Sequence, residues 1–139
     1  MNKVFVDSDV ILDLLAHRIP HFHFAALLFT FADMKKIELY TSPTVLCNVF
    51  YILRKEIGIE QAKTAMRKLR LIINVIDSSE KTIDCALNSD FSDFEDAIQY
   101  YTAQNHKLTT IVTRNVKDYK DSNLSVETPE MFLCSREFV

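Results

Sequence analysis

The chain has 139 residues, a net charge of −3 and a hydrophobic fraction of 48%, so we expect one globular domain over residues 1–139. Its single glycine excludes the glycine-rich loops that cradle nucleotide phosphates. The apolar stretches are too short and too interrupted to span a bilayer. Asp7, Asp9 and Asp13 break the apolar region that a signal peptide needs, which predicts a cytoplasmic protein with no membrane partner.

The cysteines are few and widely separated. They form no CxxC pair, and they are Cys47, Cys85 and Cys134. An odd number of widely spaced cysteines argues against a disulfide framework. We therefore predict three buried, reduced thiols.

Short apolar runs that are typical of strands alternate with longer helical patterns along the chain. The predicted strands cover residues 3–6, 38–41, 74–76, 110–113 and 125–127. The predicted helices lie near residues 9–16, 21–35, 43–57, 60–72, 79–89, 93–105 and 129–134. This alternation predicts a three-layer α/β/α sandwich with a mainly parallel central sheet.

The first predicted strand ends directly at Asp7, in the string KVFVDSDVILDLLAHR. In parallel α/β sheets, ligands bind at the carboxyl ends of the strands. Asp9 and Asp13 crowd the same segment, and close carboxylates repel one another unless a cation or a proton holds them. The segment therefore favours a cation site, while the alternative is a simple helix N-cap at Asp7.

The helix predicted at 43–57 begins with Ser42 as N-cap and Pro43 in its first turn. Asn48 falls on the apolar stripe that Val45 and Val49 define. A buried amide must be hydrogen-bonded. Asn48 therefore either holds a neighbouring backbone or borders a polar cavity.

Basic side chains concentrate on the two middle helices, although the net charge of −3 gives no global attraction to nucleic acid. They are Arg54, Lys55, Lys63, Arg67, Lys68 and Arg70. Such residues form either a solvated face or a local patch for RNA.

A second acidic group opens the helix predicted at 93–105, in the string SDFSDFEDAIQYYTAQ. Ser92 and Glu95 have the spacing of a capping box, with Glu95 at the third helical position. Asp93 and Asp96 are three residues apart and share a helix face. These acids complement the helix dipole, and they would form a divalent-metal site if the fold brings them to Asp7.

A polar loop follows the strand predicted at 110–113. Thr113, Arg114 and Asn115 stand at its carboxyl end, with Lys117 and Asp118 just beyond. These donors and acceptors suit the orientation of a metal-bound water or a backbone phosphate. The alternative is a polar loop without a ligand.

Together these motifs resemble the PIN domain family, the nuclease module of VapC-like toxins, over nearly the whole length. The motifs are FVDSDVILDLLAHR, SPTVLCNVFYILRK, DFEDAIQYYTAQ, IVTRNVKDY and VETPEMFL, in this order. The resemblance implies an α/β/α sandwich that gathers acids at one end of its sheet to bind Mg²⁺ or Mn²⁺. It also implies a metal-dependent ribonuclease that hydrolyses RNA, with an antitoxin protein or a second copy of the chain as partner.

The resemblance also assigns residues to the site. The first acid of the family corresponds to Asp7 and the third to Asp96, and Asp93 is a supporting acid, so all three are expected metal ligands. Asn48 stands where the family usually has a glutamate, and Asn115 stands where an aspartate is frequent. An amide oxygen can bind Mg²⁺ but carries no charge.

The remaining expected site residues lie in the strand-end loops. Thr113 and Arg114 are expected to contact the substrate, and Asp9 and Asp118 are expected to support the metal ligands from behind.

Two other functions fit the same residues. The asparagines favour a PIN-like module that binds RNA or a protein without catalysis. An apolar strand followed by Asp7 is also typical of phosphoryl-transfer proteins, in which a phosphoaspartate would form at Asp7 or Asp77.

Overall fold

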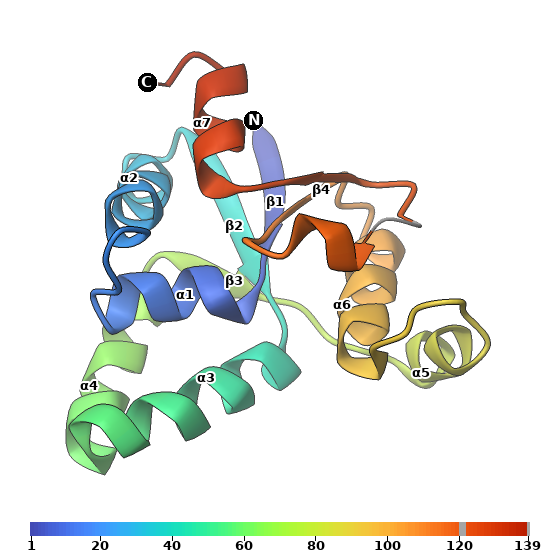
Figure 1. Ribbon diagram of the computed structural model, residues 1–139, viewed down its shortest axis with the longest axis horizontal. Coiled ribbons are helices and arrows are strands. Elements are labelled where there is room, and N and C mark those ends of the chain that lie inside the picture. Colours follow the sequence, from blue (N-terminus) through green and yellow to red (C-terminus); the bar gives the residue numbers. More distant parts are fainter. Residues whose placement is uncertain (120–121, 139) are drawn as a thin grey trace.

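Five parallel strands form the centre of the computed structural model, which describes residues 1–119 and 122–138 (Figure 1). Their order is β3-β2-β1-β4-β5. The strands are β1 (Asn2–Val6), β2 (Ile37–Thr41), β3 (Ile73–Val75), β4 (Thr110–Val112) and β5 (Ser125–Glu127). The predicted strands are confirmed to within a residue at each end.

The helices also follow the prediction closely. They are α1 (Ser8–Leu15), α2 (Phe22–Asp33), α3 (Pro43–Ile57), α4 (Ile59–Arg70), α5 (Glu80–Leu87), α6 (Phe94–Asn105) and α7 (Pro129–Ser135), with a short 3₁₀ helix η1 (Val116–Tyr119). Within the described residues, no helix combines the length and the apolar character needed to cross a membrane.

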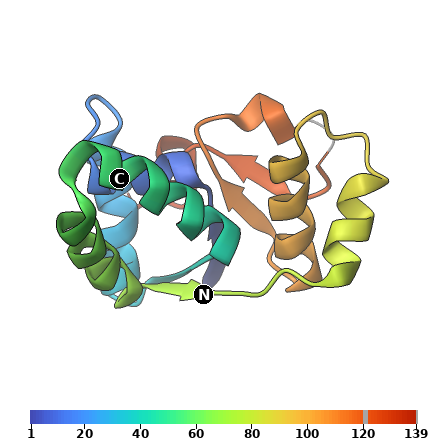
Figure 2. The same cartoon turned by 90° about the horizontal axis from the view of Figure 1, so that it is seen from below.

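The helices cover the two faces of the sheet, which confirms the three-layer sandwich. Figure 2 shows α1 to α4, in blue to green, on one side of the strands, and α5 and α6, in yellow to orange, on the other. Helix α7 returns to the first side and packs on α2. The central strand β1 is covered on both faces, so Val4, Phe5 and Val6 are fully buried, as a continuous apolar run predicts for a parallel sheet.

Two local predictions are wrong. The expected capping box at Ser92 does not form, because α6 begins one residue later with Asp93 as its N-cap. The thiols are free, but Cys47 and Cys134 are exposed and Cys85 is only partly buried. On α3 the buried stripe is Val45, Val49 and Leu53, which leaves the side chain of Cys47 on the outer face.

Several helices end in the left-handed conformation without using glycine. His17, Lys35, Lys107 and Glu137 have φ between 52° and 60°. At the end of α2, for example, Lys35 N donates to Ala32 O and Lys36 N donates to Phe31 O, both at 2.9 Å. This is the hydrogen-bond pattern of a Schellman motif, in which glycine usually takes the left-handed position.

We expect Lys35→Gly to stabilise the protein by about 0.5 to 1 kcal/mol, because glycine removes the Cβ strain of the left-handed conformation. Chemical denaturation of wild type and variant measures the difference. Lys36→Gly is the matched control, since Lys36 is also exposed but has no positive φ. It should destabilise the protein or leave it unchanged. Equal effects of the two substitutions would contradict this account of the helix end.

Candidate functional site

The expected site residues meet at the carboxyl ends of β1 and β4, beside the first turns of α1, α3 and α6 (Figure 1). Strands β1 and β4 are neighbours in the sheet, but the helices after β1 and those before β4 cover opposite faces. The chain therefore changes direction across the sheet at this point. In open α/β sheets, this switch point is where ligands bind.

Asp7 lies at the bottom of the site and is only 6% exposed. It is the N-cap of α1, and its Oδ1 accepts from Ser8 N at 2.7 Å. Its Oδ2 accepts from Thr113 Oγ1 at 2.9 Å. Burial raises the pKa of Asp7 above its ordinary value, against the opposing effect of these hydrogen bonds. Asp7 therefore serves as the helix N-cap and also lies in the site, so the two alternatives drawn from the sequence are compatible.

Asp9 lies in the first turn of α1, two residues after Asp7, against the loop after β4. Its Oδ2 accepts from Arg114 N at 3.0 Å and from Asn115 Nδ2 at 3.2 Å. Its Oδ1 is buried and has no hydrogen-bond partner among the described residues. Burial, followed by the charge of Asp7, raises the pKa of Asp9 from 3.8 to about 6. A buried carboxylate oxygen without a donor marks a place where a cation or water is needed.

Thr113 is fully buried and cannot reach a substrate, which corrects the expected substrate contact. Its hydroxyl lies 2.9 Å from Asp7 Oδ2 and 3.3 Å from Asp9 Oδ2, and it accepts from Asn115 N at 3.1 Å. Thr113 therefore positions the two carboxylates relative to each other. Burial of this side chain follows from the β4 pairing, which continues to Thr113 N donating to Glu127 O.

Arg114 is held by a buried acid on α1. Its Nε donates to Asp13 Oδ2 at 2.6 Å and its Nη2 donates to Asp13 Oδ1 at 3.2 Å. Asp13 is 1% exposed, whereas the Arg114 side chain is 30% exposed. This two-pronged pair fixes the loop after β4 against α1. The exposed part of the guanidinium remains available for the predicted substrate contact.

Tyr119, at the end of η1, joins the strand-end acids to those of α6. Its hydroxyl donates to Gln99 Oε1 at 2.8 Å, and it lies 3.4 Å from Asp7 Oδ2 and 3.5 Å from Asp96 Oδ1. A phenol has one proton to donate, so the short contact to Gln99 leaves Asp7 and Asp96 poorly satisfied. Burial and the neighbouring acids raise the pKa of Tyr119, which keeps the phenol neutral.

Asp96 faces this group from the first turn of α6. Burial, together with the charges of Asp93 and Asp7, raises its pKa from 3.8 to about 7. Asp118 contributes in the same sense, which places this expected supporting acid near Asp96. Asp93 is exposed and accepts from Asp96 N at 3.0 Å as the N-cap of α6.

Asn48 closes the site from α3. It is half-buried, and its Nδ2 lies 3.4 Å from Ser8 Oγ and 3.4 Å from Glu95 Oε1. The amide therefore borders the acidic group, which agrees with the polar-cavity alternative. Glu95 points across to α3 instead of back to its own helix end. Burial, followed by the charge of Asp93, raises the pKa of Glu95.

Sequence reasoning missed four contributors to this site: Ser8, Glu95, Gln99 and Tyr119. Ser8 and Glu95 lie beside acids that the sequence singled out, so proximity along the chain was a usable signal. Gln99 and Tyr119 are buried polar side chains in otherwise apolar surroundings, at 1% and 2% exposure. Asp77 is exposed beyond the edge strand β3 and takes no part in the site.

The donor chemistry fits a hard divalent cation. Asp7, Asp9 and Asp96 would supply oxygen ligands. Their pKa values are raised first by burial and, for Asp9 and Asp96, also by the charge of Asp7. Among the described residues, no three carboxylate, imidazole or thiol groups are close enough together to coordinate one metal ion by themselves. Mg²⁺ usually binds one or two carboxylates together with waters and substrate phosphates, so an open acidic site suits it.

The basic residues of the middle helices lie elsewhere. Four of them line a groove of about 660 Å³ between α3 and α4, together with apolar side chains. The lining residues are Leu46, Cys47, Phe50, Tyr51, Arg54, Lys63, Met66, Arg67 and Arg70. An apolar floor with a basic rim is less suited to RNA than the solvated basic patch that the sequence alone suggested.

Comparison with known proteins gives a consistent result. Residues 3–117 match the family described as PIN domain. Ribonuclease VapC1 of Aquifex aeolicus is 27% identical over 97% of this chain and 95% of its own length. VapBC2 of Rickettsia felis, solved with a DNA fragment from its promoter, superposes with a TM-score of 0.67 at 18% identity, over 91% of this chain and 98% of that one. VapC20 of Mycobacterium tuberculosis, described as a Sarcin-Ricin loop cleaving toxin, gives 0.61 at 18% identity, over 78% and 86%.

We expect the free energy of unfolding to fall as the pH rises from about 4 to about 7 in metal-free buffer. Asp9 and Asp96 have a pKa of about 6 and about 7 in the folded protein against 3.8 ordinarily. The folded state therefore holds more protons than the unfolded chain in this window, and its stability is lost as they dissociate. Denaturant titrations across the pH range measure the slope.

Asp96→Asn should reduce this slope and stabilise the protein at about pH 8 by on the order of 1 kcal/mol, far below the full linkage value because Asp96 is half-exposed. Asp84→Asn, at an exposed acid on α5, is the control and should follow the wild-type curve. A wild-type stability that increases from about pH 4 to pH 7 would contradict the repulsion.

We expect Arg114→Ala to cost about 3 to 5 kcal/mol of stability, because it leaves the buried Asp13 carboxylate without its cation. Arg18→Ala removes a comparable arginine–carboxylate pair to Glu56, but both partners there are partly exposed, at 33% and 44%. That control should cost under about 1 kcal/mol. Thermal or chemical denaturation compares the two, and equal losses would mean that burial of Asp13 is not what matters.

Proposed function

The chain belongs to the PIN domain family, and from this premise we propose that it is a divalent-metal-dependent ribonuclease, the toxin of a toxin–antitoxin pair. The observation that carries the proposal is the group of Asp7, Asp9 and Asp96 at the switch point of the sheet, with pKa values raised by burial and by one another. VapC1 of Aquifex aeolicus, a ribonuclease by name, aligns along nearly the whole chain.

Asp7 and Asp96 would hold the cation, with Asp93 as a supporting acid, and the ion would be Mg²⁺ or Mn²⁺, both of which favour oxygen ligands. When bound, such an ion supplies two kinds of chemistry: it lowers the pKa of a water and it offsets the charge that builds on the phosphate. The protein's own contribution is to keep carboxylates in place that would otherwise move apart.

The surrounding side chains orient these carboxylates. Thr113 holds Oδ2 of Asp7, while Asn115 and Arg114 N hold Oδ2 of Asp9. Asp7 Oδ1 is fixed by Ser8 N. We assign Asn115 to positioning Asp9, and the exposed part of Arg114 to contact with the RNA.

Two neighbouring acids compensate for the asparagines at 48 and 115. Glu95 reaches Asn48 at 3.4 Å and brings a carboxylate to the place where the family's glutamate is expected. Asp9 likewise brings a carboxylate to Asn115, whose Nδ2 donates to Asp9 Oδ2 at 3.2 Å. We propose that Glu95 and Asp9 supply the negative charge that the two amides lack, so that the site keeps enough charge for a divalent ion.

A protein partner also belongs to the proposal. A solved complex from Klebsiella pneumoniae has the same fold and is described as a toxin-antitoxin complex. In this chain, the groove between α3 and α4 offers an apolar floor and a basic rim to an acidic amphipathic segment. A homodimer is the other assembly that the family suggests. We place the protein in the cytoplasm, where RNA is accessible and free thiols persist.

A catalytically inactive binding module is the second candidate. The uncharged Asn48 and Asn115 favour it, because metal affinity falls with the number of charged ligands. It differs from the first candidate in one respect: RNA binding would persist without metal and without Asp7.

We expect purified protein to cleave a mixed single-stranded RNA in the presence of Mn²⁺ or Mg²⁺ and to lose this activity in chelator. Asp7→Asn and Asp96→Asn should each lower the initial rate by about 100-fold or more, because each removes a charged oxygen beside the reacting phosphate. The same variants should lose the thermal stabilisation that Mn²⁺ gives to wild type. Gel electrophoresis of labelled RNA and thermal-shift assays provide the two measurements.

Asp84→Asn keeps the change in charge but lies away from the site, so it should match wild type in both assays. Wild type that is as inert as the two site variants on all RNAs would refute the nuclease. RNA binding that is retained in chelator and in Asp7→Asn would then support the binding module.

A further inference from the structure

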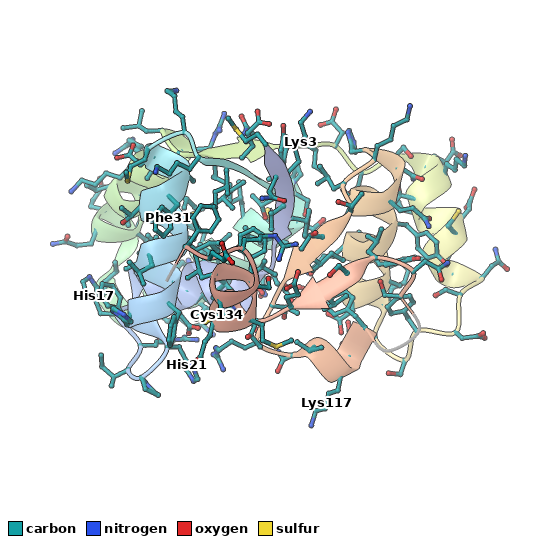
Figure 3. The ribbon with its side chains drawn as sticks, turned by 90° about the horizontal axis from the view of Figure 1, so that it is seen from above. Lys3, His17, His21, Phe31, Lys117 and Cys134 are labelled. Atoms are coloured by element: carbon teal, nitrogen blue, oxygen red, sulfur yellow. The ribbon has the colours of Figure 1, made fainter. Side chains whose placement is uncertain are left out.

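A cavity of about 280 Å³ opens beside the acidic site, between α1, the start of α2 and the start of α7. It is lined by Asp13, His21, Phe24, Arg114, Thr128, Pro129 and Glu130. Figure 3 labels His21 at the beginning of α2, on the side of the molecule where α7 and its Cys134 lie. The volume is at the lower end of the roughly 300 to 1,000 Å³ of small-molecule pockets, so one planar ring system suits it.

Residue 114 belongs to both the acidic site and this cavity. Its backbone N donates to Asp9 Oδ2 at 3.0 Å, while its guanidinium, bound to Asp13, forms part of the cavity wall. A ligand in the cavity would therefore be separated from Asp9 only by residue 114. The base of a nucleotide next to the reacting phosphate could reach the cavity from there.

The charges of the cavity argue against a phosphate. Asp13 already neutralises Arg114 through two hydrogen bonds. Glu130 adds a further carboxylate to the wall, which repels an anion. A neutral ligand that brings its own N–H donors meets no such repulsion.

We propose that this cavity binds one unstacked base of the RNA beside the cleaved bond, with guanine preferred. Phe24, His21 and Pro129 provide flat walls of the kind on which single-stranded bases stack. Arg114 N–H groups that do not face Asp13 suit the acceptor edge of guanine, the commonest partner of arginine among bases. The Glu130 carboxylate accepts from the paired N–H donors on the other edge.

The inference rests on the proposed ribonuclease activity for its biological meaning, but it can be tested separately. In the first experiment, a randomised RNA is cleaved and the ends are sequenced. We expect wild type to prefer guanine at one position next to the cut. Glu130→Gln should reduce this preference about tenfold, the effect of losing one charged hydrogen bond. Phe24→Ala should slow cleavage about tenfold whatever the base, because stacking is sequence-tolerant. Glu60→Gln, an exposed glutamate on α4, is the control and should keep the wild-type preference.

The second experiment measures binding without cleavage. Guanosine, adenosine, cytidine and uridine, which carry no phosphate, are titrated into isotope-labelled protein. We expect guanosine to shift the backbone amide signals of His21, Thr128 and Glu130, and we expect Phe24→Ala to abolish these shifts. This readout remains informative if wild type cleaves no RNA and the proposed function fails.

Four results would overturn the proposal. The first is cleavage by Glu130→Gln with an unchanged base preference. The second is the absence of shifts at these residues with all four nucleosides. The third is a response to arginine amide but to no nucleoside, which would assign the cavity to a basic side chain of a protein partner. Shifts by guanosine that survive in the folded Phe24→Ala protein would place its binding elsewhere and would also overturn it.

Discussion

The repulsion among carboxylates around Asp7 is the constraint on which the rest of the site depends. Asp7, Asp9 and Asp96 come from two helices far apart in the sequence, and burial removes the water that would screen them. In a medium of low polarity, such a group tends to bind protons or to separate. The sheet, which fixes β1 beside β4 through Val4, Phe5 and Val6, is what keeps the acids together.

The protein offsets the repulsion with neutral donors more than with cations. Thr113 and Asn115 carry no charge, yet they hold the inner oxygens of Asp7 and Asp9. Arg114, the cation of this loop, is engaged by Asp13, one turn beyond Asp9 on α1. The Asp13 pair therefore stabilises the scaffold and leaves the acids with unsatisfied charge. If Arg114 neutralised the acids of the site instead, the affinity of the site for a metal ion would be low.

The sequence predicts the secondary structure of the site better than the directions of its side chains. Apolar periodicity predicts the strands and helices, and Asp7 is conspicuous because a continuous buried run ends at it. The direction of individual side chains is not encoded in such patterns. Glu95 has the spacing of a capping box, but Asp93 takes the N-cap and Glu95 turns to Asn48. Tyr119 is missed because its partners Gln99 and Asp96 lie 20 and 23 residues earlier, on the far side of β4, and only the fold brings them together.

The same reasoning changes the meaning of the two asparagines. Considered position by position, Asn48 and Asn115 are losses of charge at places where the family has acids. Considered as a neighbourhood, each amide donates toward an adjacent acid, Glu95 or Asp9. A glutamate at position 48 would place a further negative charge beside Glu95, whose pKa is already raised. An amide there removes that repulsion and holds the carboxylate by a hydrogen bond. On the proposed assignment, Asn48 and Glu95 act as one unit, in which the first turn of α6 supplies the carboxylate for a cation in place of α3.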